Sequence, residues 1–218
     1  MKKIIFIITI FLCNILNAQV EFSNTRFGII AGPNVSAVTN AHNPSSRRTA
    51  FMAGAFAEVP IDFYRCRCEY NQLYIQAELL YVASGENGSK YDEKRKYHAD
   101  YLSIPIFLKG YLTKTASSFY GYGGPRFGFL VNQNVVNPPP GREYYAGDEG
   151  KAATFDFALA GGIGYSFNRK FEVSVRYEFG LSNAYPKLDI DYEISGDPDA
   201  LKRKSQQIVS LGISYTFD

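Results

Sequence analysis

The feature that most constrains this chain is the unbroken alternation over residues 171–182, FEVSVRYEFGLS. One register holds only apolar side chains: Phe171, Val173, Val175, Tyr177, Phe179 and Leu181. The other register holds polar or small ones, including Arg176 and Glu178. Because successive strand side chains point to opposite faces, the stretch predicts a β-strand with one apolar and one polar surface. A soluble protein would turn the polar surface outward, whereas a membrane barrel would turn the apolar surface outward, to lipid.

Strand signals recur along the chain, over 26–36, 49–59, 72–83, 99–112, 117–131, 153–167, 170–182 and 205–217. Each reaches the roughly 9–11 residues that a tilted strand needs to cross a bilayer. The connectors are alternately long and tight, such as 132–152 and 168–169, although 60–71 is long for a turn. Long outer loops and short periplasmic turns are typical of outer-membrane barrels. The predicted fold is all-β, an eight-stranded antiparallel up-and-down transmembrane β-barrel.

The bulk of the two faces decides which one points outward. Residues 154–166 present Ala, Gly, Ser, Thr and one Asp on one face, and Phe, Leu, Ile and Tyr with a single Gly on the other. An eight-stranded barrel has a narrow interior that side chains just fill, so the small residues suit the inside. We therefore expect Phe171, Val173, Val175, Tyr177, Phe179, Leu211, Ile213 and Tyr215 to face lipid. A soluble lipid-binding barrel with the apolar face inward is the alternative. Within GYGGP, residues 121–125, we expect a bulge or sharp bend.

The first residues, MKKIIFIITIFLCNILNA, predict an export signal. A basic start precedes an apolar run that ends at a small residue, Ala18, so we assign 1–18 as a cleavable signal peptide and 19–218 as the barrel domain. A lipoprotein signal at Cys13 is disfavoured by the bulky Leu12 before it. Cleavage removes two lysines and no acids, leaving 21 basic and 21 acidic residues. A neutral chain gives no electrostatic reason to bind nucleic acid. The predicted location is the outer membrane of a Gram-negative bacterium.

Two cysteines remain after cleavage, Cys66 and Cys68, in the stretch YRCRCEY. A CxC pair is compatible with redox or metal chemistry, but no histidine or second cysteine pair accompanies it. We interpret it as two incidental thiols, or a local bridge, in a turn, and we expect no metal and no cofactor.

Charged residues of the inward register form the candidate site: Glu58, Glu78, Lys109, Arg126, Asp156, Arg176 and Glu178, with Glu172 near the periplasmic rim. Buried charges must be paired or solvated, so we interpret them as a network that fills and braces the lumen. The set holds five acids and three bases. An active site or ion path is the alternative.

Catalytic signatures are weak in this chain. A hydrolase acting on lipid or peptide would need an oriented base, and the two histidines, His42 and His98, lie in or beside outer loops without a local partner. We expect both to face solvent, and we predict a non-enzymatic protein that acts as an envelope scaffold or through its outer loops.

Several stretches together resemble the PorT-like family of outer-membrane β-barrel proteins: FGIIAGPNVS, YIQAELLYVASGENG, YLSIPIFLKGYL, GYGGPRFGFLVN, FDFALAGGIGYSF, FEVSVRYEFGLSN and IVSLGISYTFD. The resemblance implies an eight-stranded membrane barrel with an export signal. It also implies, as an alternative function, an accessory role in protein secretion linked to gliding motility. It carries no catalytic motif.

The chain end and the expected lipid-facing residues imply partners. Barrels of this kind finish on an aromatic residue that the assembly machinery reads, and Tyr215 and Phe217 are the candidates, although Asp218 follows. Expected partners are the barrel assembly machinery, outer-membrane lipid, lipopolysaccharide and an envelope protein complex.

Overall fold

The computed structural model describes residues 19–20, 24–42, 44–62, 71–88, 94–196 and 198–217. Its strands are β1 (Gln19–Val20), β2 (Arg26–Val38), β3 (Ser45–Asp62), β4 (Leu73–Gly88), β5 (Lys96–Tyr111), β6 (Ser118–Val136), β7 (Phe155–Phe167), β8 (Phe171–Gly180) and β9 (Gln206–Thr216). Short helices lie in the loops: η2 (Glu143–Ala146), α2 (Ile190–Ser195) and η3 (Pro198–Leu201). The predicted signal peptide, Cys66 and Cys68 lie outside the described residues.

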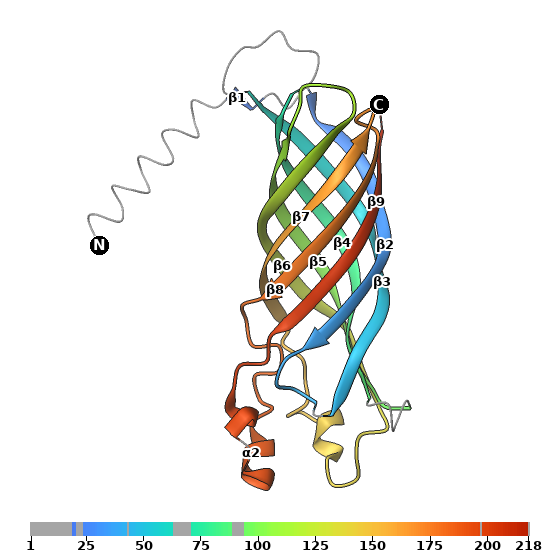
Figure 1. The fold of residues 1–218 in the computed structure, drawn as a ribbon. Helices are drawn as coiled ribbons and strands as arrows, with labels where there is room; N and C mark the ends of the chain where they lie inside the picture. Colours follow the sequence, from blue (N-terminus) through green and yellow to red (C-terminus); the bar gives the residue numbers. More distant parts are fainter. Residues whose placement is uncertain are drawn as a thin grey trace, which may run out of the picture.

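Strands β2 to β9 form a closed antiparallel barrel (Figure 1). Each strand pairs with its neighbour in sequence, and β2 pairs with β9 to close the ring, with Ile29 opposite Tyr215. The two-residue β1 pairs only with the end of β3. Closure pairs the backbone groups of every strand, which is what allows a sheet to cross lipid. The predicted fold, eight antiparallel strands in up-and-down order, is confirmed.

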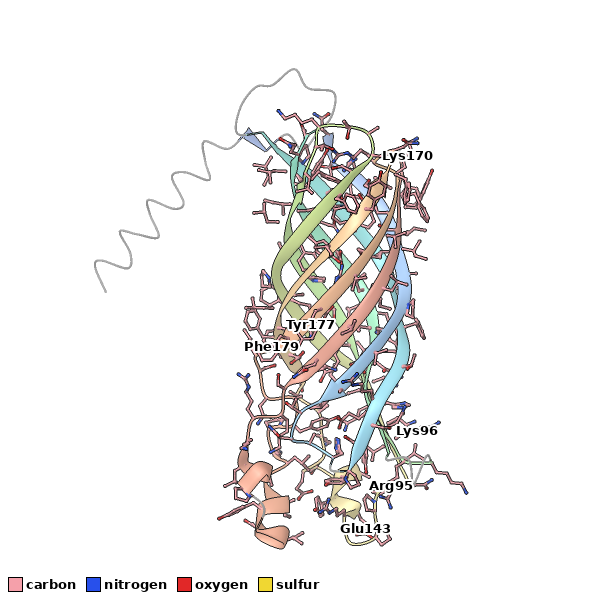
Figure 2. All side chains as sticks on the ribbon, in the orientation of Figure 1. Arg95, Lys96, Glu143, Lys170, Tyr177 and Phe179 are labelled. Carbon is pink, nitrogen blue, oxygen red and sulfur yellow. The ribbon has the colours of Figure 1, made fainter. Side chains whose placement is uncertain are left out.

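The apolar register lies on the outside. In β8 and β9 the side chains of Phe171, Val175, Tyr177, Phe179, Leu211, Ile213 and Tyr215 are exposed, and Val173, in the same register, is half-buried. Phe217 is also exposed, just past the end of β9. Bulky side chains of β4 to β7 continue this belt around the barrel (Figure 2). The belt excludes the soluble barrel with an inward apolar face. No helix among the described residues is long and apolar enough to cross a membrane.

The two ends of the barrel differ. The turns 112–117 and 168–170 lie at the end where β2 starts and β9 stops, and α2 and η2 lie at the other (Figure 1). The β7–β8 turn is tight because Asn168 and Arg169 adopt positive φ of 52° and 55°, as the central residues of a type I′ turn do, and the Lys170 N–H donates to the Phe167 carbonyl oxygen. Short turns mark the periplasmic end and long loops the outer end.

One wall of the barrel continues beyond the belt. β3 begins at Ser45 and β4 ends at Gly88, several residues into segments where the sequence predicts loops. β5 and β6 also run further than predicted, to Lys96 and Val136. The apolar periodicity stops there because the outward side chains, such as Lys96, are polar, while the ladder of backbone hydrogen bonds continues.

The glycine-rich part of β6 does not bulge as predicted, since its ladder with β7 is unbroken from Ser118 to Phe129. Tyr120 and Tyr122 instead lie opposite Gly164 and Gly162. A Cβ at Gly164 would lie 2.5 Å from Cζ of Tyr120, and one at Gly162 would lie 2.6 Å from Oη of Tyr122. The glycines therefore make room for two inward-facing tyrosine rings.

Glycine 164 gives a stability prediction. We expect Gly164→Ala to lower the free energy of unfolding by about 1–3 kcal/mol, since the methyl group overlaps the Tyr120 ring. Urea unfolding in lipid vesicles, followed by tyrosine fluorescence, measures it. Gly121→Ala is the control, because the nearest atom to its Cβ is 3.9 Å away. Equal stability of the two variants would contradict the packing account.

Candidate functional site: the lumen and its outer cap

All seven charged residues proposed for the lumen, Glu58, Glu78, Lys109, Arg126, Asp156, Arg176 and Glu178, are buried inside the barrel. They come from six strands, β3 to β8, whose inward registers bring them together. Together they form two groups, one toward the periplasmic end and one near the middle.

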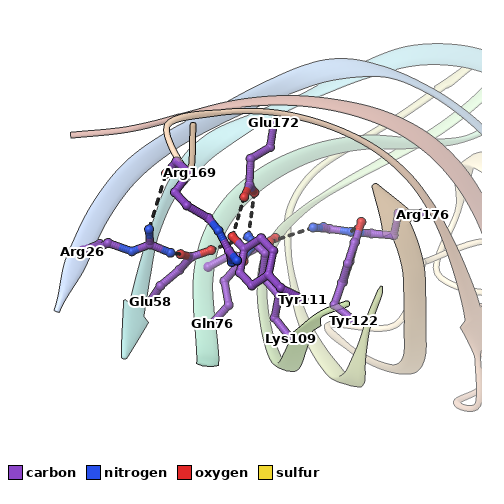
Figure 3. A network of polar contacts seen from close by, with 10 residues as sticks. Arg26, Glu58, Gln76, Lys109, Tyr111, Tyr122, Arg169, Glu172 and Arg176 are labelled. Atoms are coloured by element: carbon purple, nitrogen blue, oxygen red, sulfur yellow. Dashed lines mark hydrogen bonds and ion pairs between the residues drawn. The ribbon is translucent and has the colours of Figure 1, made fainter. Parts of the chain in front are cut away.

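Lys109 is the centre of the periplasmic group (Figure 3). Its Nζ donates hydrogen bonds to Glu58 Oε1 at 2.5 Å and to Glu172 Oε2 at 2.6 Å. Arg26 pairs with the other oxygen of Glu58, and the hydroxyl of Tyr111 donates to Glu172. Glu172 is therefore buried, and both of its carboxylate oxygens accept hydrogen bonds.

Two cations of this group, Arg26 and Arg169, were not among the predicted lumen residues. Arg26 starts β2, and Arg169 lies in the β7–β8 turn, from which its guanidinium donates to the carbonyl oxygens of Thr113 and Thr115. The same guanidinium lies 3.5 Å from the centre of the Tyr111 ring, a close cation–π contact. An excess of two acids among the predicted lumen residues was the signal that two cations were missing.

Arg176 and Arg126 organise the middle group. Arg176 Nη2 donates a hydrogen bond of 2.7 Å to Glu78 Oε1. The same oxygen also accepts a hydrogen bond from the Gln76 side-chain amide. Arg126 lies between two carboxylates, with Nη2 2.6 Å from Asp156 Oδ2 and Nε 3.1 Å from Glu178 Oε2. Both Arg126 contacts are ion pairs by charge and distance.

The charges of the described lumen balance. Five cations, Arg26, Lys109, Arg126, Arg169 and Arg176, face five anions, Glu58, Glu78, Asp156, Glu172 and Glu178. Buried apolar side chains pack beside these charges inside the barrel, including Ile30, Met52, Phe56, Leu80 and Ile208. Mutual pairing offsets the cost of burying each charge, and it leaves the lumen filled.

The outer mouth is closed by a second set of contacts, which we call the cap: Val38, His42, Tyr97, Ala99, Tyr101, Tyr145, Ala152, Ala184, Tyr185 and Leu188. Tyr145 comes from the loop between β6 and β7, and Tyr185 from the loop between β8 and β9. A backbone hydrogen bond of 2.8 Å from Ala153 N to Ala184 O joins these two loops. A second, also 2.8 Å, from Ala184 N to Lys204 O links the two ends of the β8–β9 loop.

His42 lies at the centre of the cap, and the prediction that it faces solvent is wrong. Its ring stacks on Tyr97 with centroids 3.9 Å apart, and Tyr145 and Tyr185 meet it edge to face. Its Nδ1 lies 3.1 Å from Glu86 Oε2. Burial, with the charge of Glu86 beside it, raises the pKa of Tyr185 well above its usual value, so this ring stays neutral.

Glu86 ties the same centre to the barrel wall. Its Oε1 accepts from the Val38 backbone N–H at 2.9 Å and from the Ser45 hydroxyl at 3.0 Å. Ser45 therefore directs its proton to Glu86 and not to His42. His98 lies on β5 instead of in a loop, half-buried, with Nε2 3.1 Å from Asn87 Oδ1. Among the described residues no three His, Cys, Asp or Glu side chains are grouped so that they could hold a metal.

A closed barrel with an apolar exterior and a filled, ion-paired interior defines an outer-membrane β-barrel protein. The model of the outer membrane protein beta-barrel domain family matches residues 16–185, so the chain belongs to this family. The protein is therefore located in the outer membrane.

Solved structures with a similar fold include Ail, the attachment invasion locus protein of Yersinia pestis, at 12% identity and a TM-score of 0.44, covering 88% of this chain and 98% of that one. OprG of Pseudomonas aeruginosa has 13% identity and a TM-score of 0.43, over 88% and 95% of the two chains. The outer membrane enzyme PagL has 15% identity and a TM-score of 0.44, over 86% and 98%. No curated protein matches the chain.

Lys109 allows the lumen network to be tested. We expect Lys109→Met to lower the free energy of unfolding by about 3–5 kcal/mol, because Glu58 and Glu172 lose the cation between them. Unfolding in urea from lipid vesicles measures this loss. Adding Glu172→Gln should recover part of it, and Lys151→Met, which removes an exposed ion pair, is the control. A Lys109→Met variant as stable as the control would contradict the network.

The cap gives a separate prediction. We expect His42→Ala to loosen the loops 137–154 and 181–205, since their tyrosines lose the ring they enclose. Limited proteolysis of intact cells should then cleave these loops at least several-fold faster, while the barrel keeps its heat-modifiable migration on gels. His98→Ala, which removes only an outer-wall contact, is the control. Unchanged cleavage in His42→Ala would refute the role of His42.

Proposed function

We propose that this protein is a non-enzymatic, non-conducting outer-membrane scaffold that acts through the surface of its outer loops. The observation that carries the proposal is the double closure of the barrel. Ion pairs fill the lumen from Arg26 to Asp156, and the cap covers its mouth with buried aromatic rings. Such a barrel offers no open path for a solute, so the outer surface is where it can meet partners.

The loop between β8 and β9 is the best candidate for a partner surface. Its apolar side chains Tyr192, Ile194 and Leu201 are exposed, although the cap beneath them buries Tyr185 and Leu188. Exposed apolar residues on a loop that already has its own core favour contact with another protein. The proposed partner is a component of an envelope protein complex, and lipid, lipopolysaccharide and the barrel assembly machinery are further proposed partners.

A hydrolase acting on lipid or peptide is the alternative from another class. The structure gives His42 an orienting carboxylate, as a general base would need. Three tyrosine rings enclose that imidazole, however, and it is only 2% exposed. This enclosure favours a structural His42–Glu86 pair.

The accessory role in secretion rests on the resemblance to the PorT-like family. The stretches that support it are those of the wall, such as YLSIPIFLKGYL in β5, and not the outer loops. A deletion strain should then accumulate secreted cargo in the periplasm, and normal export would remove this alternative.

The scaffold proposal predicts two results. In planar bilayers the wild-type chain should show no steady conductance, because the lumen is filled. In affinity isolation from native outer membranes, Tyr192→Ser with Ile194→Ser should lose, by at least fivefold, an envelope protein that the wild type retains. Lys187→Ser, an exposed change in the same loop, is the control. A stable open channel, or equal retention by both variants, would contradict the proposal.

A further inference from the structure

In the described part of the chain the lipid-facing belt has a hollow that the surrounding side chains do not fill. It encloses about 320 Å³ between β2, β3, β8 and β9. Its floor is Ala31, Ala53 and Gly54, and its sides are Ile29, Ile213 and Tyr215. The hollow exists because Ala31 lies directly opposite Ala53 in the β2–β3 ladder, so two small side chains meet where other parts of the belt are bulky. On the β9 side Ala31 lies opposite Ile213, whose larger side chain borders the hollow.

A lysine lies at the periplasmic end of this hollow. Phe171 lines the hollow, and the residue before it is the exposed Lys170 in the β7–β8 turn. The carbonyl of Lys170 accepts a hydrogen bond of 2.8 Å from the Thr216 N–H, which holds the turn beside the last residue of β9. Figure 2 shows Lys170 at this end of the barrel, next to the strand ends.

Two other cations at this rim, Arg26 and Arg169, point toward the lumen. The guanidinium of Arg26 pairs with Glu58 and that of Arg169 packs on Tyr111. Lys114 lies in the turn between β5 and β6, strands that do not line the hollow. Lys170 adjoins the hollow by its position, because it precedes Phe171 and its carbonyl oxygen accepts a hydrogen bond from the residue after Tyr215. An apolar hollow in the membrane with a cation one residue beyond its end is complementary to a lipid with an anionic headgroup.

We propose that this hollow, from Ala31 and Ala53 to Lys170, is a binding site for a glycerophospholipid of the periplasmic leaflet. One acyl chain lies along the small residues, and the headgroup phosphate lies at Lys170. The hydrophobic effect does not favour this lipid over others in a bilayer, since all tails are equally apolar. Retention depends on van der Waals contact in the hollow and on the charge at its end. The site is independent of the cap and of the proposed partner surface.

Photo-crosslinking tests the acyl-chain part. The full mature chain is placed in nanodiscs with a phosphatidylglycerol that carries a diazirine in one acyl chain, and adducts are mapped by mass spectrometry. We expect peptides containing Ala31, Ala53 and Ile213 to carry at least fivefold more adduct than the peptide containing Ala77, a lipid-facing alanine of β4 outside the hollow. Ala53→Leu should remove most of this excess, while Ala77→Leu should leave it unchanged.

Charge reversal tests the headgroup part. Lys170→Glu should lower the adduct in the hollow several-fold, and Lys114→Glu, at an exposed lysine of the other described periplasmic turn, should not. Heat-modifiable migration on gels shows that every variant is folded. Even labelling around the belt would overturn the proposal, because the contact would then be unselective. Chain-to-chain crosslinks at Ala53 in place of lipid adducts would also overturn it, because a second copy would then occupy the hollow.

Discussion

A ring of eight hydrogen-bonded strands leaves an interior only wide enough for side chains, and everything inside it must fit and be electrically balanced. This constraint explains why Lys109 lies between two carboxylates and Arg126 between two others. It also explains the glycines of β7, because the space that a side chain there would occupy is filled by tyrosine rings of β6. The same ring places the bulky side chains outside, so lipid contact and lumen packing follow from one geometry.

The outer cap depends on this lumen in a different way. Its loops vary in length and sequence, yet they meet at His42, which Glu86 holds from the barrel wall. Because β3 to β6 run beyond the belt, they give the cap a rigid wall against which Tyr145 and Tyr185 can pack. The filled barrel thus carries a small second core outside the membrane, and the residues above that core are the ones left to meet other molecules.

The orientation of most wall side chains could be predicted, because the odd or even position of a residue in its strand decides whether its side chain points to lipid or to the lumen. Arg176 and Glu178 point inward and Tyr177 outward simply because they alternate. Parity could not give their partners, since Arg176 meets Glu78 from a strand 98 residues away in sequence. Arg26, the first residue of the predicted strand 26–36, shares the inward parity of Gly28 and Asn34 and could have been predicted. Arg169 was missed because it lies in a turn, where no periodicity applies. His42 was misplaced for the same reason: a loop residue carries no signal of what will fold over it.

By itself the sequence determined the closed barrel, its orientation and the direction of nearly every strand side chain, since the two-residue period and the connector lengths are local properties. Only the tertiary structure decided which charges pair, that His42 is buried, and where the belt leaves a hollow beside Lys170. Those outcomes depend on the registers between strands that are distant in sequence and on the packing of loops. Both are set by the closure of the whole ring and not by any one segment.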